Sequence, residues 1–185
     1  MVVAPGAYDG LTAKLIDQAN FSAIYMTGGG TSCGHGYPDY GLLTMSEMVA
    51  NAGRMADAVD QPVISDADNG YGNELNTFRT IREFEKAGVA GVHLEDQAFP
   101  KRCGHLEDKE LISLDDYLAK IRAAADARRD PNFTIIARTD ARATDGFEEA
   151  MWRVRAFADV GADILFLEAP QNEAEMRAFC DGVPG

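Results

Sequence analysis

The sequence predicts an α/β protein, a TIM-type (β/α)8 barrel of which about six βα units are present. Short apolar runs alternate with longer amphipathic stretches, which indicates parallel strands joined by helices. The runs are nearly continuous rather than alternating, as is typical of strands buried on both faces. Polar residues follow nearly every run, and no Gly-x-Gly-x-x-Gly follows the first one. Both features favour a barrel over an open, doubly wound sheet.

The expected elements follow one another in a regular order. A capping box formed by Thr44 and Glu47 opens a helix whose apolar face reaches Val59. Ser113 and Asp145 each precede an acidic residue by three positions and are expected to open two more helices, and Asn76 is expected to cap another. The predicted strands are residues 2–4, 23–26, 62–65, 91–94, 134–137 and 163–167.

The chain length sets the expected domain organisation. A complete barrel of this kind takes about 250 residues, and the sequence has 185. We therefore expect residues 1–185 to form a single (β/α) barrel domain that is incomplete at its C-terminus. The outer edges of its first and last strands then need a partner or a cover.

Composition excludes several classes of protein. The charge sum is 17 − 30 = −13, so binding to nucleic acid or to an anionic membrane surface is disfavoured. No apolar run approaches the roughly 20 residues of a membrane span, and no secretory signal is visible. Three cysteines without a Cys-x-x-Cys motif favour a reducing compartment, which is the cytoplasm or an organelle matrix.

Acidic residues follow three of the predicted strands: the third, the fourth and the sixth, which Glu168 follows. Asp66 and Asp68 are two positions apart, so both carboxylates can face the same point, and Glu95 ends the next strand. Such a cluster predicts a divalent cation with hard oxygen ligands, Mg²⁺ foremost, with Mn²⁺ as a substitute. Each acid taken singly is equally typical of a helix cap or of a solvated loop.

Two further strand ends suggest an anion site. Thr27, Gly28 and Gly29 follow the second strand, where bare glycine amides can hold a carboxylate or phosphate. Arg138 ends the fifth strand and can clamp a carboxylate through two hydrogen bonds. A flexible turn, and an Arg138 paired with Glu95 or with Glu168 after the sixth strand, are the simpler interpretations.

Residues 101–105, Lys-Arg-Cys-Gly-His, are the most specific feature of the sequence. Positive charge beside Cys103 is typical of a reactive thiol, whereas lone cysteines are usually buried and inert. The segment lies in a long loop after the fourth strand, and such loops are often lids. We interpret Cys33 and His35 as loop residues, and His93 and Cys180 as core.

These motifs together resemble the isocitrate lyase/phosphoenolpyruvate mutase superfamily, in particular its methylisocitrate lyase-like branch, which cleaves oxaloacetate or 2,3-dimethylmalate. The resemblance covers the whole chain, and the run of Lys101 to His105 is specific for lyase members. It is carried by Pro5-Gly6-Ala7-Tyr8-Asp9, Tyr25-Met26-Thr27-Gly28-Gly29, Gly36-Tyr37-Pro38-Asp39-Tyr40-Gly41, residues 66–72, Leu94-Glu95-Asp96-Gln97, residues 101–105, Ala137-Arg138-Thr139-Asp140 and Leu167-Glu168-Ala169.

The resemblance implies Mg²⁺-dependent cleavage of a carbon–carbon bond in a 2-hydroxy or 2-oxo di- or tricarboxylate, giving a 2-oxo acid such as pyruvate. It implies a metal held by Asp66 and Asp68, with Asp39 and Glu95 near its waters. Tyr25 matches a proposed base, and Cys103 matches the acid, on a gating loop. The remaining implied site residues are Lys101 and His105 in catalysis and Thr27, Gly28, Gly29, Gly104, Arg138 and Glu168 in substrate binding.

The resemblance also implies a homotetramer for the full-length form, and a small carboxylate as the bound partner. Two alternatives stay open at this point. One is an oxaloacetate decarboxylase or a phosphoenolpyruvate-type phosphonomutase on the same scaffold. The other is a truncated binding module without catalytic activity.

Overall fold

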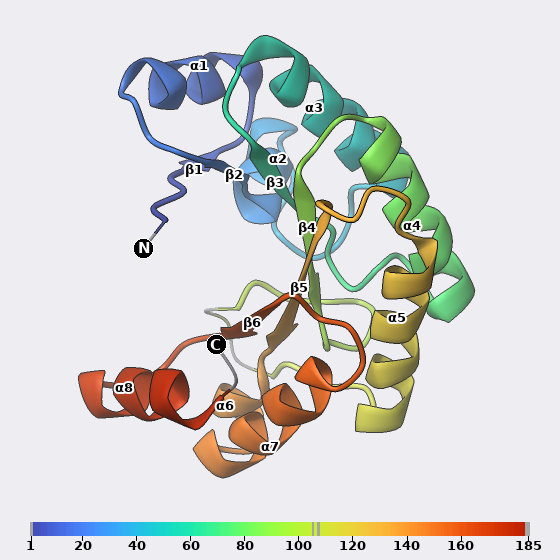
Figure 1. Cartoon of the computed structure of the whole chain (residues 1–185), viewed down its shortest axis with the longest axis vertical. Helices are drawn as coiled ribbons and strands as arrows, with labels where there is room; N and C mark the ends of the chain where they lie inside the picture. The colour runs from blue at the N-terminus through green and yellow to red at the C-terminus, as the bar shows by residue number, and fades with distance from the viewer. Residues whose placement is uncertain (1, 105, 107, 184–185) are drawn as a thin grey trace.

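Six parallel strands form one sheet in the described part of the chain, in the order β1-β2-β3-β4-β5-β6 (Figure 1). The structure is a computed structural model and describes residues 2–104, 106 and 108–183. Every strand pairs in parallel with the next strand along the chain. This consecutive order is that of a barrel wall and confirms the predicted α/β class. The strands are β1 (Gly6–Ala7), β2 (Ile24–Met26), β3 (Val63–Asp66), β4 (Gly91–Glu95), β5 (Thr134–Thr139) and β6 (Ile164–Leu167).

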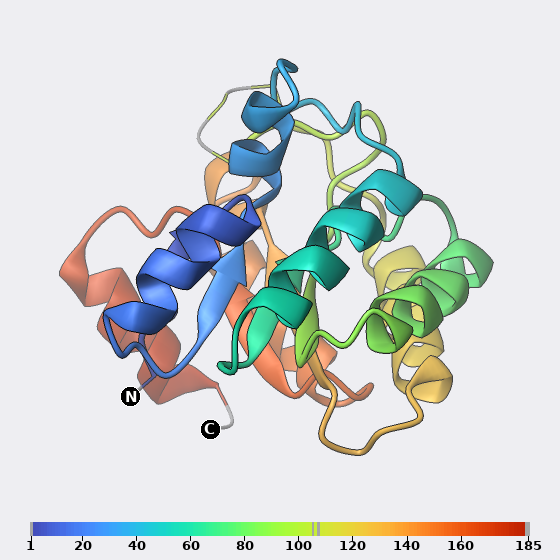
Figure 2. The same cartoon turned by 90° about the horizontal axis from the view of Figure 1, so that it is seen from above.

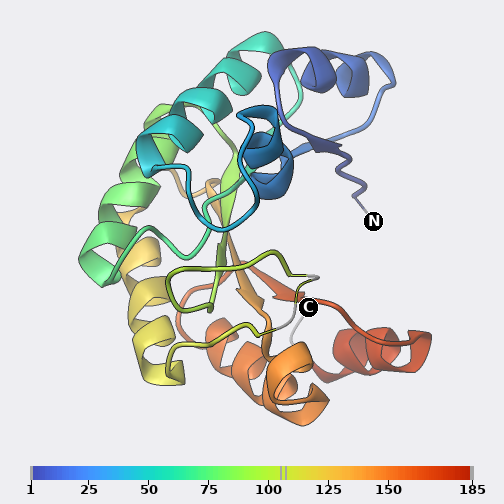
Figure 3. The same ribbon diagram turned by 180° about the vertical axis from the view of Figure 1, so that it is seen from behind.

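Helices lie along the outer side of the curved sheet, where Figures 1 and 3 show them as an arc. They bury residues such as Met55, Ile81 and Phe157 against the outer face of the strands. The helices are α1 (Gly10–Gln18), α2 (Gly28–Gly34), α3 (Met45–Ala58), α4 (Glu74–Lys86), α5 (Leu114–Ala127), α6 (Ala141–Thr144), α7 (Phe147–Ala158) and α8 (Glu173–Gly182). No helix in the described ranges is long and apolar enough to span a membrane.

The first strand lies further along the chain than the sequence predicts. Residues 2–4 are not a strand; Val2 and Val3 are 69% and 49% exposed, and β1 is Gly6–Ala7 instead. Register explains the difference, because Ala7 lies beside Met26 of β2 and is buried. The apolar run of Val2 and Val3 therefore indicated the wrong segment.

The helix starts test the capping predictions. Thr44 and Glu47 form the expected capping box of α3, and the Ser113 side chain accepts from the backbone N–H of Asp116 at the start of α5. The cap of α4 is Asn73, and Asn76 is its reciprocal partner three residues later. The cap predicted at Asp145 is wrong, since that residue terminates the short α6 and α7 begins after Gly146.

The inner face of the sheet borders an apolar cavity of about 360 Å³. Its walls come from five strands, β2 to β6, and include Tyr25, Ile64, His93, Ile136 and Ile164. Strands β1 and β6 pair on one side only within the described residues, and Ile164 is 47% exposed. The curved sheet thus leaves its interior open along one side.

Candidate active site

The carboxyl ends of the parallel strands lie at one end of the molecule, together with α2 and the loop between β4 and α5 (Figure 2). A cavity of about 260 Å³ lies there. Nearly all the residues that the sequence singled out border it, from five strands or the segments that follow them. They are Tyr25, Thr27, Gly28, Gly29, Asp39, Asp66, Glu95, Lys101, Cys103, Gly104, Arg138 and Glu168.

Asp68 and His105 complete the set of predicted catalytic and metal-binding residues. Asp68 is not among the lining residues but lies directly beside them, because its backbone N–H donates to Asp66 Oδ1 over 2.9 Å. Its Oδ1 is 2.8 Å from Lys101 Nζ. His105 lies outside the described residues.

The Lys101 ammonium lies among the acidic side chains. Its Nζ is 2.6 Å from Asp39 Oδ1 as well as 2.8 Å from Asp68 Oδ1, and the side chain is only 4% exposed. Burial acts to lower the pKa of Lys101, but the charges of Asp66 and Asp68 raise it overall, so the amine stays charged. Lys101 therefore offsets part of the repulsion between the acids.

The buried carboxyl groups differ in protonation. Burial and the charge of Asp66 raise the pKa of Asp68 to about 6. Burial raises the pKa of Glu95 well above its ordinary value, against the opposing effect of Arg138. Burial also acts to raise the pKa of Asp66, but nearby basic groups, led by His93 and Lys101, lower it overall. Asp66 is consequently the most persistent anion of the three.

The acids suit a divalent cation in chemistry. They supply hard oxygen donors and excess negative charge at one place, and Glu95 Oε1 is buried with no hydrogen-bond partner among the described residues. As the side chains lie, no three His, Cys, Asp or Glu residues of the described ranges form a metal-holding group. The donor atoms thus fit the ion in their chemistry. In the present arrangement, however, the Lys101 ammonium neutralises Asp39 and Asp68.

Half-buried Tyr25 and buried His93 form a hydrogen-bonded pair beside Asp66. The Tyr25 hydroxyl and His93 Nδ1 are 2.8 Å apart, and Nδ1 is 3.6 Å from Asp66 Oδ1. Burial lowers the pKa of His93 to about 4, so the ring is neutral near pH 7. Burial and Asp66 raise the pKa of Tyr25 well above 10, so its hydroxyl is protonated. With His93 Nε2 lacking a described partner, the ring is more than the satisfied core residue that the sequence suggested.

The glycine segment is the first turn of a helix rather than a flexible turn. The Thr27 side chain caps α2 by accepting from the Gly30 N–H over 3.0 Å. The Gly28 N–H donates to Asp66 Oδ2 over 3.1 Å, and a Cβ at Gly28 would overlap that carboxylate. Glycine is therefore required where the backbone passes the acid. Cys33 also belongs to α2, which corrects its interpretation as a loop residue.

Arg138 is held by acidic side chains on several sides. Its Nε and Nη2 donate to the two oxygens of Asp140 over 2.9 and 3.0 Å. Its Nη1 is 3.3 Å from Glu168 Oε2, and it lies beside Glu95 in the register of β4 and β5. The sequence predicted the pairing with Glu168 as an alternative but gave no role to Asp140, which follows two residues later. In the sequence, only the position of Asp140 after the end of a strand could have indicated that it belongs to the site.

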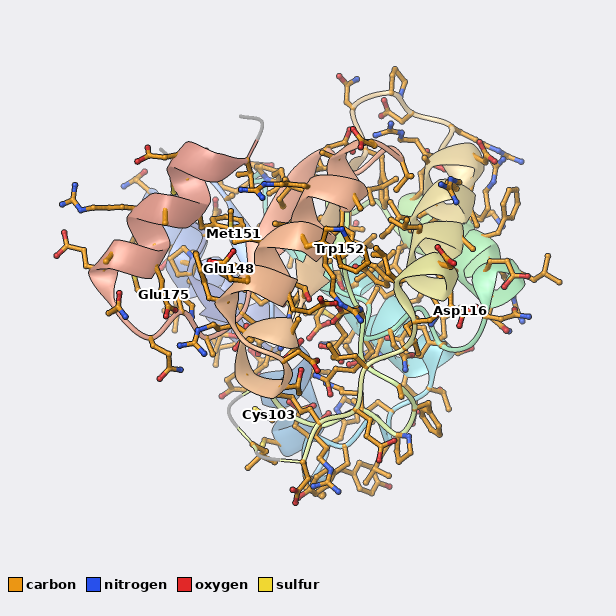
Figure 4. The ribbon with its side chains drawn as sticks, turned by 90° about the horizontal axis from the view of Figure 1, so that it is seen from below. Cys103, Asp116, Glu148, Met151, Trp152 and Glu175 are labelled. Carbon is orange, nitrogen blue, oxygen red and sulfur yellow. The ribbon has the colours of Figure 1, made fainter. Side chains whose placement is uncertain are left out.

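Cys103 is half-buried on the long loop, close to α2 (Figure 4). The loop is anchored at its base, where Ala98 N–H donates to Glu110 O over 2.7 Å and Gln97 bridges Leu111. Gln97 also pairs with the backbone of Arg102, through two hydrogen bonds of 2.9 Å. In contrast, Cys180 is exposed on α8, so its assignment to the core was wrong.

The comparisons with known proteins agree with this geometry. The family model described as phosphoenolpyruvate phosphomutase matches residues 1–185. The chain belongs to the phosphoenolpyruvate mutase/isocitrate lyase superfamily. It is 53% identical over 186 residues to 2,3-dimethylmalate lyase of Eubacterium barkeri, a match that covers 100% of this chain and 64% of that protein.

Solved structures of the superfamily superpose closely on the chain. A crystal structure of 2,3-dimethylmalate lyase matches with a TM-score of 0.96 at 44% identity and covers 100% of this chain and 62% of that one. A structure of phosphonopyruvate hydrolase in complex with oxalate and Mg²⁺ matches with a TM-score of 0.90 at 34% identity, over 100% of this chain and 64% of that one. These members confirm the TIM-type fold, and the chain spans less than two thirds of their length.

Proposed function

We propose that this chain provides the strand-end site of a Mg²⁺-dependent carbon–carbon lyase that cleaves a 2-hydroxy or 2-oxo di- or tricarboxylate. The observation that carries the proposal is the cavity shared by Cys103, Arg138 and the acids. It combines a proton donor, a cation for the substrate carboxylate and donors for a metal ion. The name of its relative, 2,3-dimethylmalate lyase, supports a substrate of this class.

Cleavage of a 2-hydroxy substrate needs a base for the hydroxyl proton and an acid for the departing carbanion. The Tyr25–His93 pair suits the base, since the Tyr25 hydroxyl and Nδ1 of the neutral imidazole share a hydrogen bond of 2.8 Å along which a proton can pass. As the carbon–carbon bond breaks, its electron pair passes to the departing fragment, which takes a proton from the Cys103 thiol. Arg138 suits the carboxylate of the substrate, since Asp140 and Glu168 orient its guanidinium.

The proposed metal is Mg²⁺, with Mn²⁺ as a substitute, held by Asp66 and Asp68 with Glu95 beside them. When bound, it supplies Lewis-acid polarisation of substrate oxygens. Two observations support the choice. Glu95 Oε1 is buried and has no hydrogen-bond partner in the part of the chain that the structure describes, and Mg²⁺ is named with the phosphonopyruvate hydrolase structure.

A phosphonate-acting enzyme is the second candidate, favoured by the likeness to phosphonopyruvate hydrolase. A thiol acid would protonate the enolate left by either reaction. The lyase is favoured instead by the higher identity to 2,3-dimethylmalate lyase, 53% against 34% for phosphonopyruvate hydrolase. We further propose that the protein acts in the cytoplasm or an organelle matrix, in line with three free cysteines.

A side-by-side assay tests the proposal. The protein is incubated with 2,3-dimethylmalate, 2-methylisocitrate, oxaloacetate and phosphonopyruvate, with Mg²⁺ or with EDTA, and released 2-oxo acid and phosphate are measured. We expect Mg²⁺-dependent release of a 2-oxo acid from a hydroxy acid. Phosphate release from phosphonopyruvate alone would favour the second candidate, and turnover that is unchanged in EDTA would contradict the metal assignment.

A further inference from the structure

Lys109 is a buried lysine next to the candidate active site that the proposed chemistry does not use. Its side chain is 1% exposed, and its Nζ lies 3.0 Å from Asp140 Oδ1. The same ammonium donates to the backbone carbonyl of Gly104. Lys109 therefore connects the loop segment that follows Cys103 to an aspartate that ends a strand.

That aspartate is itself fixed in place. Asp140 Oδ1 also accepts from Arg138 Nη2 over 3.0 Å, and the Asp140 N–H donates to Asp96 Oδ1 over 3.0 Å. Asp96 in turn accepts from the Thr139 hydroxyl over 2.6 Å and from Arg153 Nη1 over 3.2 Å. Asp140 is thus a rigid support shared by two cations, one from the substrate site and one from the loop.

The loop backbone lies directly on the Arg138–Glu168 pair. A Cβ added at Gly104 would overlap Arg138 Nη2 and Glu168 Oε1, so a larger residue there would have to displace these two groups or the loop. On the other side of Cys103, Lys101 Nζ is bound to Asp39 and Asp68. The residue that carries the thiol is consequently held between two buried lysines.

We propose that Lys109 is a positioning residue that holds Gly104 against the Asp140–Arg138 pair and so fixes the Cys103 thiol over the substrate site. A fixed geometry of this kind is what proton transfer in the transition state requires. A buried ion pair with only a structural role would contribute to stability and leave the accessibility of the thiol unchanged. The inference rests on the proposed function for the task of the thiol, but its test does not need turnover.

The test measures how fast Cys103 reacts with iodoacetamide, without substrate, in a Cys33→Ser, Cys180→Ser background that leaves one thiol. Lys109→Met removes the charge and keeps most of the volume, and Lys14→Met on exposed α1 is the matched control. We expect Lys109→Met to raise the rate of alkylation at least about tenfold, and Lys14→Met to change it less than twofold. Equal rates in the two variants, with equal melting temperatures, would overturn the proposal.

A second measurement approaches the same contact from the loop and covers the case in which Lys109→Met does not fold. Gly104→Ala places a methyl group against Arg138 and Glu168, which should lift the loop and free the Lys109 amine. Lysine labelling read by mass spectrometry should then show Lys109 reacting at least about tenfold faster than in the unchanged protein, with Lys14 as the internal reference. Unchanged protection of Lys109 would contradict the coupling.

Kinetics separate this inference from the proposed function. If the lyase assay succeeds, Lys109→Met should lower kcat at least about tenfold and change KM by less than about threefold. A fall in kcat that is equal in Lys109→Met and in the control Lys14→Met would argue against a specific positioning role. If the assay fails while the labelling results hold, the proposed function is wrong and the positioning of the thiol stands.

Discussion

Single residues at the strand ends have clearly different roles in the structure. Cys103 is half-exposed and lies in the same cavity as Arg138, whereas Cys33 and Cys180 are exposed on helices. The cavity around Cys103 therefore distinguishes its thiol from those of the other two cysteines. The acids differ likewise, because Asp66 is stabilised as an anion and Glu95 is not.

Replacement of the thiol provides the first prediction. Cys103→Ser keeps the shape of the side chain and removes an efficient proton donor, so kcat should fall by about 100-fold or more, in the range for loss of a general acid. KM should change by less than about threefold, since Arg138 and the metal donors remain. Steady-state kinetics check this, with Cys180→Ser as the control, and near-normal turnover would remove Cys103 from the mechanism.

The clamp on Arg138 provides a prediction about pH. Burial acts to raise the pKa of Asp140, but the hydrogen bond and the charge of Arg138 lower it overall. Its folded pKa lies below its unfolded value of about 3.9, so its stabilising contribution is present above pH 4 and is lost as the pH falls through the folded pKa. Asp140→Asn should therefore lower the free energy of unfolding by about 3 kcal/mol at pH 7, and by less near pH 3.

Urea unfolding at both pH values measures this difference. Asp60→Asn, at an exposed position, is the control and should change little at either pH. A deficit in Asp140→Asn that is equal at pH 3 and pH 7 would show that the carboxylate charge does not carry the effect.

At the scale of elements, hydrogen bonds at the helix starts position the loops around the site. In the capping box, the backbone N–H and the hydroxyl of Thr44 both donate to Glu47 Oε2 over 2.7 Å. This capping box begins α3 directly after the segment that carries Asp39. The cap at Asn73 similarly begins α4 shortly after Asp68. The acids are thus placed by connections whose ends are fixed by local hydrogen bonds.

Thr44→Ala tests this local contribution. The variant loses the side-chain half of the capping box, in which Thr44 Oγ1 accepts from the Glu47 N–H, and keeps the backbone N–H that donates to Glu47 Oε2. The free energy of unfolding should therefore fall by about 1 kcal/mol. Ser22→Ala, in an exposed turn, should change stability by less than about 0.5 kcal/mol. Thermal or urea unfolding measures both variants, and equal stabilities would show that α3 is held by packing alone.

At the scale of the whole molecule, the open side of the sheet is the dominant feature. Strand β6 has one pairing partner in the described chain, and its Ile164 side chain borders the apolar cavity at 47% exposure. An apolar strand edge of this kind favours association with another chain. If copies of this chain associate, we expect a second copy to pack on this open side.

Self-association of the 185-residue chain tests this expectation. Ile164→Lys places a charge at the open edge and should weaken self-association, so that its dissociation constant rises at least about fivefold. Leu75→Lys replaces another exposed apolar residue, 73% exposed on α4, and should have little effect. Sedimentation velocity over a concentration series measures both, and equal association would locate the contact elsewhere.

Much of this organisation is readable in the sequence, because it depends on local pattern. Apolar runs separated by amphipathic stretches force parallel strands, and parallel strands collect their polar ends at one edge. Arg138, Glu95 and Asp66 could be placed together on that ground alone, and the Thr44 capping box needs only residues three positions apart.

The remaining features depend on contacts between distant residues. Lys109 meets Gly104, five positions away, and Asp140, 31 positions away, and nothing in its neighbourhood along the chain indicates either contact. The first strand was misplaced for a similar reason, since pairing with β2 selects Gly6–Ala7 over a more apolar run. Loop paths and strand register are properties of the assembled sheet, so only the folded chain shows which cation lies beside which acid.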